Sequence, residues 1–413
     1  MRIFSGRAAE TRVQQLAQRG AQLGEVEGAV RRIVNDVRRR GDRAVRHYAA
    51  KWDGLRRGQP LRVEERAMRA AWKAATPAFR AALRVAEKNI RQFCQWQKPV
   101  PWKRTRAGIT LGQVVRPLES VGCYVPGGRH PLVSTLLMTV IPAQVAGVEN
   151  IRVVSPRPCN ELLAAAGMLG VKEFYRVGGA QAIAALAYGT PSIPRVAKIV
   201  GPGNLYVTAA KKLVAFDCAI DFLAGPTEVV IACDEGDAEF LAADLVAQAE
   251  HDPEAMAVFI TSRRALAEAV GKAVDEMART NKIARESLRR HGAILRAESR
   301  AQALAWANQI APEHINVSRR DVSAVQNAGS VFVGDFSPQA AGDYASGPNH
   351  VLPTAGVARF RGGLSVMDFV KLITVQELSQ SGLRRLAPAV EYLAETEGLT
   401  AHAESIRVRV NHG

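Results

Sequence analysis

The chain has few long hydrophobic runs: none of its segments approaches the roughly 18 uninterrupted apolar positions from which a transmembrane helix is inferred. We therefore expect no membrane span. The first residues, Met1 to Arg7, also lack the apolar core of a secretory signal, so we expect a cytoplasmic protein. A hydrophobic fraction of 47% and a charged fraction of 23% are typical of a globular protein, and 413 residues predict two or more domains.

Cysteine is scarce, and its pattern excludes a disulfide framework. The five cysteines form no C-x-x-C pair, and their odd number does not suit systematic pairing. Reduced thiols are typical of the cytoplasm, and we predict that all five are structural. They are Cys94, Cys123, Cys159, Cys218 and Cys233.

Acidic residues are scarce in the N-terminal quarter. Residues 1–106 contain 26 Lys and Arg against 9 Asp and Glu, a balance of +17, whereas the whole chain carries +16. A basic face of this kind can bind polyanions. The segment has no known nucleic-acid motif, however, and arginine is frequent throughout the chain. Nucleic-acid binding is therefore a minor alternative.

Helical periodicity dominates residues 1–95, and alternating strands and helices follow from Gly112. Strands are expected at 113–115, 120–125, 150–155, 173–177 and 197–200, with helices between them. A second series, after Pro226, has strands near 228–232, 255–261, 293–295, 314–317 and 330–333. Repeated β-α units predict parallel sheets covered on both faces, in two α/β domains that join near residues 225–226. The tail from Leu364 is predicted to be helical.

The long segment 342–354, G-D-Y-A-S-G-P-N-H-V-L-P-T, follows a predicted strand and has no helix or strand pattern. Such a run is usually functional or disordered, and its apolar residues argue against disorder. It carries Asp343, Asn349 and His350. A packed loop whose histidine satisfies a buried carbonyl remains an equal alternative.

Two further pairs combine residues suited to metal binding or catalysis. Gln248 and His251 lie three apart near a predicted helix end, so both side chains can reach one metal; a histidine that interacts with the helix dipole is the alternative. Glu313 and His314 stand at the mouth of a predicted strand, and strand ends of parallel sheets bind ligands. In the tail, Glu397 and His402 are typical of a solvated face.

No G-x-G-x-x-G fingerprint is present. Glycine-rich turns nevertheless close three strands, at 124–128, 177–181 and 201–204, where backbone N–H groups and a helix dipole favour phosphate or polar ligands. Ordinary turn glycines are the alternative.

Together these segments resemble the histidinol dehydrogenases. Nine motifs carry the resemblance in order: V-G-C-Y-V-P-G-G (121–128), V-G-G-A-Q-A-I-A-A-L-A-Y-G-T (177–190), G-P-G-N (201–204), A-G-P-T-E-V (224–229), Q-A-E-H (248–251), P-E-H (312–314), A-G-D-Y-A-S-G-P-N-H-V-L-P-T (341–354), T-V-Q-E-L-S (374–379) and E-G-L-T-A-H (397–402).

The resemblance implies NAD- and zinc-dependent oxidation of L-histidinol to L-histidine through L-histidinal, the last step of histidine biosynthesis, in a homodimer. The implied general base is His314, and Glu313 would activate the water that hydrates the aldehyde. The implied zinc ligands, one ion per subunit, are Gln248, His251, Asp343 and His402. The implied NAD residues are Tyr124, Gln181 and Asn204. Substrate contacts would come from Thr227, His350, Glu397, His314 and the four zinc ligands. An aldehyde step invites a covalent cysteine, but Cys123, the nearest candidate, has no such role in the family.

The resemblance also implies an α/β fold with two incomplete Rossmann-like parallel-sheet domains, an N-terminal helical arm and a C-terminal helical tail swapped in the dimer. We predict that residues 1–18 form the arm. Residues 19–123 with 228–364 would form the first Rossmann-like domain, which carries most catalytic and zinc residues. Residues 124–227 would form the NAD-binding domain, and residues 365–413 the dimerisation tail, through which Glu397 and His402 reach the partner's site.

Two other enzymes remain alternatives. A dehydrogenase of the same fold could oxidise another small diol, such as a sulfonated propanediol, but Glu397 would repel a sulfonate and suits the cationic amine of histidinol. A zinc hydrolase could use Glu313 as its base, and independence of NAD would reveal it.

Overall fold

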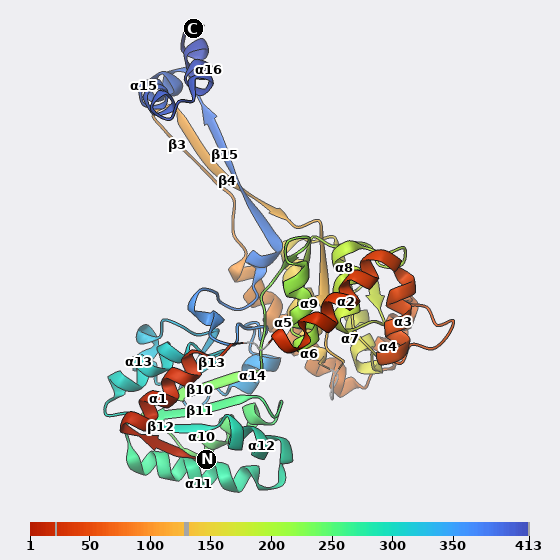
Figure 1. The fold of residues 1–413 in the computed structure, drawn as a ribbon, viewed down its shortest axis with the longest axis vertical. Helices are drawn as coiled ribbons and strands as arrows, with labels where there is room; N and C mark the ends of the chain where they lie inside the picture. The colour runs from red at the N-terminus through yellow and green to blue at the C-terminus, as the bar shows by residue number, and fades with distance from the viewer. Residues whose placement is uncertain (21–22, 128–131, 412–413) are drawn as a thin grey trace.

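The computed structural model describes residues 1–20, 23–127 and 132–411, which form three sheets (Figure 1). One six-stranded sheet is parallel throughout, and we call it and its helices the β10 domain. Its strands in spatial order are β1 (Ile3–Ser5), β12 (Ala293–Arg296), β11 (Met256–Thr261), β10 (Glu228–Ala232), β13 (His314–Val317) and β14 (Ser330–Val333). Its helices are α1 (Gly6–Ala17), α10 (Ala238–Ala249), α11 (Arg264–Met277), α12 (Lys282–Arg290), α13 (Arg300–Ile310) and α14 (Gln339–Tyr344).

The second six-stranded sheet contains β5 at its centre, and we call this the β5 domain. Its strands in spatial order are β2 (Arg62–Val63), β7 (Glu173–Tyr175), β6 (Asn150–Val154), β5 (Ser120–Tyr124), β8 (Lys198–Val200) and β9 (Ala219–Ile220). All pairs are parallel except β2 with β7. Its helices are α2 (Gly24–Arg40), α3 (Asp42–Trp52), α4 (Glu65–Ala74), α5 (Pro77–Gln97), α6 (Val133–Ala146), α7 (Asn160–Met168), α8 (Gly179–Tyr188) and α9 (Leu205–Val214).

The side chains of β10 point alternately to the two faces of the sheet, and they show why its strands are apolar on both faces. Successive side chains of a strand point to opposite faces of its sheet. Val229 and Ile231 pack into a buried cluster with α10 and α11, whereas Val230 and Ala232 pack into a second cluster with α1 and α13. All five residues of β10 are buried. The sequence-based prediction of parallel sheets covered on both faces is thus confirmed.

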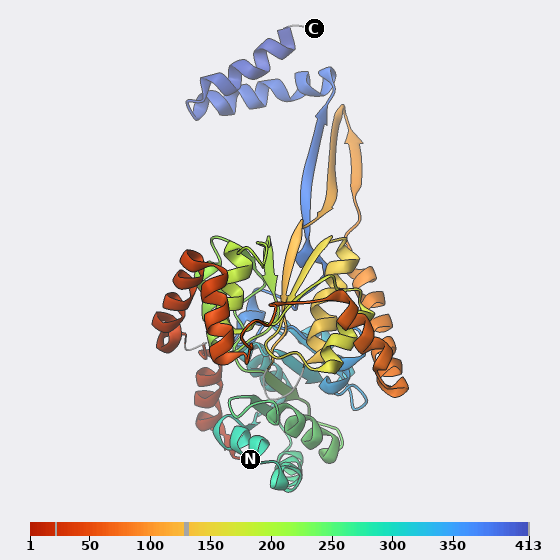
Figure 2. The same ribbon diagram turned by 90° about the vertical axis from the view of Figure 1, so that its right-hand side faces the viewer.

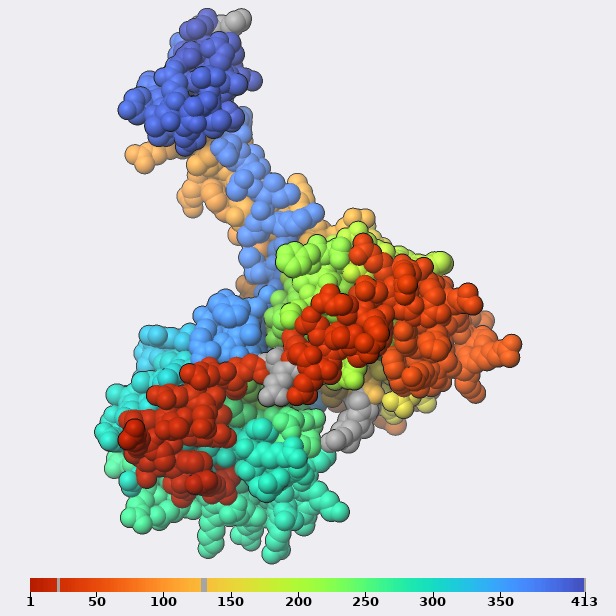
Figure 3. Space-filling model, viewed as in Figure 1, coloured from red at the N-terminus to blue at the C-terminus, as the bar shows by residue number. Residues whose placement is uncertain are grey.

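The third sheet is an antiparallel stalk made of β15 (Val370–Leu378), β4 (Ile109–Pro117) and β3 (Trp102–Arg106). It projects from the two domains and carries the C-terminal helix pair, α15 (Gln380–Thr396) and α16 (Thr400–Asn411), at its far end (Figures 1 and 2). The space-filling view shows the helix pair separated from both domains by this narrow stalk (Figure 3). Among the described residues, no helix combines the length and the apolar content that a membrane crossing requires.

The predicted domain boundaries are wrong in the N-terminal third. Residues 19–123 were expected with 228–364, but β2 and β5 belong to the β5 sheet, and α2 packs on α8 and α9 of that domain. An amphipathic helix shows that one face needs cover, but its pattern does not say which sheet supplies it. Residues 1–18 are also no separate arm, because β1 pairs with β12 and α1 packs on α13.

The predicted helical tail is wrong in its first part. Residues 370–378 form β15, which pairs with β4 over nine residues, and eight of the nine are exposed. The amphipathic pattern of the tail predicts a helix there, but Val370, Ile373 and Val375 are β-branched and favour a strand. The strand predicted at 113–115 is likewise longer and lies in the stalk instead of the β5 sheet.

Candidate active site

Glu313 and His314 lie at the start of β13, between β10 and β14. Their exposed fractions are 6% and 2%. Thr227 precedes the neighbouring strand β10, and His314 pairs in register with Val229. The group therefore lies at the amino ends of these parallel strands. Ligand sites of such sheets are usually expected at the carboxyl ends.

The carboxylate of Glu313 accepts hydrogen bonds at one oxygen. Its Oε2 lies 2.5 Å from the donating Oγ1 of Thr227 and 2.8 Å from the backbone N of Glu228. Gln248 donates from Nε2 to the same Thr227 hydroxyl, at 2.5 Å. Burial raises the pKa of Glu313 to about 7, although the charge of His314 and these hydrogen bonds act against it. A carboxyl group titrating near neutrality suits proton transfer.

His314 presents one ring nitrogen for chemistry. Its Nδ1 lies 2.9 Å from the backbone oxygen of Glu228, so Nδ1 carries the proton and donates it there. Its Nε2 is buried, has no hydrogen-bond partner within the described part of the chain and lies 3.5 Å from Oδ1 of Asp343. Burial lowers the pKa of His314, but the charges of Glu313 and Asp343 outweigh it and raise the pKa above its usual value.

Asp343 lies on the short helix α14, where no regular structure was predicted. Burial raises the pKa of Asp343, but His314, His350 and His251 together hold it below its usual range. His350 has its Nδ1 2.7 Å from the backbone oxygen of Asp343 and its Nε2 3.3 Å from Oγ1 of Thr135 in α6. Burial lowers the pKa of His350. The long segment thus brings an acid and an imidazole to the catalytic pair and joins the two domains.

Gln248 and His251 lie at the end of α10 beside this group. Gln248 is 1% exposed, and its Oε1 is buried and has no hydrogen-bond partner among the residues that the structure describes. His251 is exposed and close enough to Asp343 to affect its pKa. Among the described residues, no group of three or more His, Cys, Asp and Glu is placed to hold a metal ion. The amide oxygen of Gln248, the imidazole of His251 and the carboxylate of Asp343 nevertheless lie around the same part of the candidate site.

The structure does not bring Glu397 and His402 to this site. Glu397 ends α15 and His402 lies in α16, both exposed. This helix pair is at the far end of the stalk from the β10 domain (Figures 1 and 2). Of the four predicted zinc ligands, three therefore lie in the β10 domain and the fourth does not.

The three predicted NAD residues line one cavity of about 460 Å³ in the β5 domain. Tyr124 ends β5, Gln181 is in α8 after β7, and Asn204 caps α9 after β8. This cavity therefore lies at the carboxyl ends of the β5 sheet, the usual position for a ligand. The Tyr124 hydroxyl accepts a hydrogen bond from the backbone N of Gly179, at 3.1 Å.

Neighbouring backbone atoms leave no room for a side chain at two glycines at or beside the cavity. A Cβ on Gly127 would lie 2.3 Å from the backbone oxygen of Pro156, and one on Gly201, whose φ is +111°, would lie 2.2 Å from the backbone oxygen of Tyr124. Any side chain there would push apart the strand ends that form the cavity. The glycine-rich turns are thus required by packing even without a G-x-G-x-x-G pattern.

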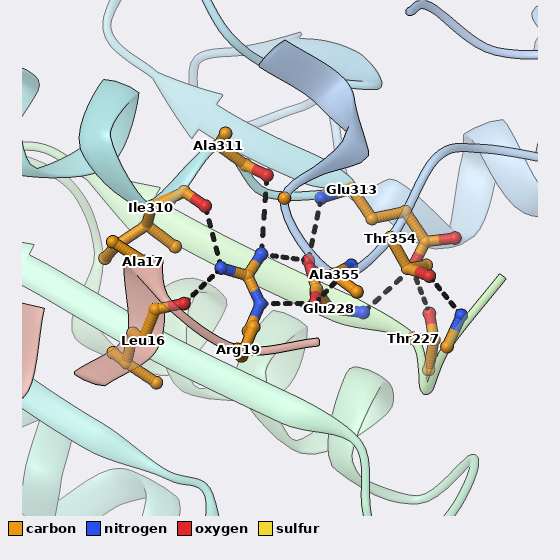
Figure 4. Close-up of polar contacts among 12 residues, drawn as sticks. Leu16, Ala17, Arg19, Thr227, Glu228, Ile310, Ala311, Glu313, Thr354 and Ala355 are labelled. Carbon is orange, nitrogen blue, oxygen red and sulfur yellow. Dashed lines mark hydrogen bonds and ion pairs between the residues drawn. The ribbon is translucent and has the colours of Figure 1, made fainter. Parts of the chain in front are cut away.

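Arg19 and Glu228 are important residues that the sequence analysis did not identify (Figure 4). The Arg19 guanidinium pairs with both carboxylate oxygens of Glu228, each at 2.5 Å. It also donates to the backbone oxygens of Leu16 and Ile310. Glu228 is the first residue of β10, directly after Thr227, and its backbone binds both Glu313 and His314. Its place in A-G-P-T-E-V was the only available signal.

The cysteines are free and offer no activated nucleophile. Four of them are buried, and Cys159 is half-buried. Burial raises the pKa of Cys123, the one nearest Tyr124, to about 12. A thiol that stays protonated is a poor nucleophile, which supports a structural role.

Comparison with known proteins relates this arrangement to one family. The family model for histidinol dehydrogenase matches residues 16–410. A histidinol dehydrogenase of Methanothermobacter thermautotrophicus is 47% identical over 416 residues, which cover 97% of each chain. One from Bacillus anthracis is 45% identical and covers 93% of this chain and 92% of the relative.

A solved structure agrees over the whole chain. The crystal structure of histidinol dehydrogenase from Elizabethkingia anophelis superposes with a TM-score of 0.94 at 35% sequence identity. The match covers 100% of this chain and 98% of the other. The two parallel-sheet domains and the stalk are thus the architecture of that protein as well.

Proposed function

Because the chain belongs to the histidinol dehydrogenase family, whose members oxidise histidinol in histidine biosynthesis, we propose that it carries out the full four-electron oxidation. The product is L-histidine, L-histidinal is the intermediate, and NAD and one zinc ion per subunit take part. The observation that carries the proposal is the chain of contacts from Gln248 through Thr227 to the Glu313–His314 pair. The five unpaired thiols support a cytoplasmic location.

The two buried bases divide the proton transfers between them. His314, in its neutral form, takes the alcohol proton at Nε2, which has no hydrogen-bond partner among the described residues, as the substrate carbon loses its first hydride. Glu313 then takes a proton from the water that adds to the aldehyde, and the resulting hydrate loses the second hydride. NAD, when bound, accepts one hydride in each oxidation. One water is consumed, and its oxygen stays in the carboxylate of the product.

The residues around Gln248 fit a zinc ion. The Gln248 Oε1 is buried and has no partner in residues 1–20, 23–127 and 132–411, and an acceptor of this kind is costly unless a cation or donor satisfies it. Gln248, His251 and Asp343 would supply three of the protein ligands. Zinc would hold the amine and imidazole of the substrate so that its alcohol carbon faces His314.

The fourth ligand would come from the tail of a second subunit. The helix pair exposes Tyr392, Leu393 and Leu399 at 71%, 59% and 43%, and the stalk is exposed on both faces. Apolar surface of this extent on a projecting element is typical of an interface. In a symmetric dimer, His402 of the partner subunit would bind the zinc and Glu397 of the partner subunit would contact the cationic amine.

The first test counts the NADH formed for each L-histidinol consumed by the purified protein. We expect two NADH per substrate, loss of activity on treatment with a chelator, and its return when zinc is added back. A zinc-loaded protein that forms no NADH from histidinol would contradict the proposal; a sulfonated propanediol would then be assayed as substrate. Product release without any need for NAD would indicate the zinc hydrolase.

The shared site is tested with two variants, Gln248→Ala and His402→Ala, each expected to be inactive alone. Co-expressed with different tags and purified on both, they form dimers in which one site lacks both ligands and the other is intact. We expect such dimers to recover about half of the wild-type activity. A dimer of wild type with Gln248→Ala serves as the control for one lost site. Absence of any recovery would show that His402 acts within its own subunit.

A further inference from the structure

Asp53 connects α3 to the cavity that holds the predicted NAD residues. It follows α3 as its C-cap and is 8% exposed. Its Oδ2 accepts two hydrogen bonds, one from the backbone N of Gly178 and one from Nε2 of Gln181, each at 3.0 Å. Asp53 lines the cavity together with Gln181. A carboxylate from a distant part of the sequence thus holds the first turn of α8.

This contact fixes which way the Gln181 amide faces. A carboxylate only accepts hydrogen bonds, so the amide nitrogen must face Asp53 and the amide oxygen must face away. The oxygen, Oε1, lies beside Gly179, where a Cβ would approach it to 2.8 Å. Gln181 is 1% exposed, and its Oε1 has no hydrogen-bond partner in the described part of the chain. A buried acceptor without a donor is costly, and a ligand in the cavity can supply that donor.

The surroundings of Asp53 hold it in a rigid geometry. Burial raises the pKa of Asp53 above its ordinary value, and the hydrogen bonds from Gly178 and Gln181 and the charge of Arg157, which lines the same cavity, oppose this rise only in part. Gly179 donates its backbone N–H to Tyr124, so two successive backbone N–H groups of this turn are held by side chains of the cavity. A Cβ on Gly178 would lie 2.6 Å from Pro156, which closes the turn from the other side.

We propose that Asp53 is a positioning residue for the dinucleotide. It orients Gln181 so that the amide oxygen accepts a hydrogen bond from an N–H or O–H group of the bound cofactor. The inference rests on the proposed function only in taking the cavity as the NAD site. Asp53 itself takes no part in hydride or proton transfer, so it acts on cofactor affinity and leaves the chemical step unchanged.

The experiment is a double-mutant cycle on NAD affinity with Asp53→Ala, Gln181→Ala and the double variant. Alanine removes the oxygen that accepts from Nε2 of Gln181, so the Gln181 amide loses its preferred orientation. We expect each single variant to weaken NAD binding about 10-fold and the double variant to bind no more weakly than Gln181→Ala. At saturating NAD, kcat and the KM for histidinol of Asp53→Ala should stay at wild-type values.

Asp42→Ala is the matched control, because Asp42 at the other end of α3 accepts from the backbone N of Ser192 and does not line the cavity. If the losses of the two single variants multiply in the double variant, or if kcat falls in Asp53→Ala, the inference is wrong. Wild-type protein that binds no NAD would instead contradict the proposed function.

Gln181→Glu gives a second test that does not require Asp53→Ala to fold. The introduced carboxyl group can donate to Asp53 only when it is protonated, so NAD affinity should rise as the pH falls. The other charged or titratable groups lining the cavity are Arg157, Tyr124 and Tyr206. An affinity of this variant that is independent of pH, with wild-type protein measured in parallel, would contradict the role of Asp53.

Discussion

Replacing Glu313 by glutamine is expected to stop the reaction at the aldehyde. Glutamine retains the shape and can still accept from Thr227 and the backbone of Glu228, but it cannot take a proton from water. Loss of a general base typically costs about 10²- to 10⁴-fold in rate. We expect one NADH per histidinol instead of two, measured in a single turnover with an aldehyde trap. Glu235→Gln, an exposed position of the same domain, is the control.

The pH dependence of aldehyde oxidation, the second step, tests the role of Glu313 more specifically in the same variant. Burial raises the pKa of Glu313 to about 7, above the ordinary range of a glutamic acid. The base works only as the carboxylate, so the rate of aldehyde oxidation should rise with pH through about 7 and level off above it. In Glu313→Gln this rise should be absent. A variant that forms two NADH at the wild-type rate would exclude Glu313 as the base.

The general architecture could be predicted because its signals are local. Strands such as β10 and β11 are continuous apolar runs bounded by polar residues, and the helices between them have clear periodicity. The joint predicted near residues 225–226 agrees with the passage from β9 to β10. These local signals could not show to which domain the helices α2, α3, α4 and α5 belong. The helices on which α2 packs, α8 and α9, lie more than 100 residues away in the sequence, so packing alone selects them.

In the candidate site, too, some residues could be identified from local sequence patterns, whereas the roles of others arise only from tertiary contacts. Residue types in local patterns identified Gln248 with His251 and Glu313 with His314, but their common location came from the family resemblance. Asp53 and Arg19 could not be found in this way. Asp53 is one acid in a basic, helical segment without a motif, and its role arises from contacts with residues 178 and 181. Arg19 is one of 26 basic residues in the first 106.

Replacing Arg19 by methionine is expected to destabilise the β10 domain strongly. Methionine keeps most of the aliphatic stem, so the change mainly removes the guanidinium. The Glu228 side chain is 4% exposed and would be left as a buried charge without its partner. Breaking a buried ion pair in this way typically costs about 3 to 5 kcal/mol. Urea unfolding, with hydrogen exchange of α1 and α13 as the local probe, measures the loss.

Removing the second charge should restore part of that stability. In Arg19→Met/Glu228→Gln no unpaired charge remains, and the introduced amide can still accept from the backbone N of Ala355, as Glu228 does at 2.9 Å. Arg264→Met is the control, because its partner Glu268 and its own side chain are largely exposed, and we expect a wild-type midpoint. If Arg19→Met unfolds like that control, the ion pair contributes no stability. If the double variant is no more stable than Arg19→Met, the loss comes instead from the carbonyls of Leu16 and Ile310, which lose their donor in both proteins.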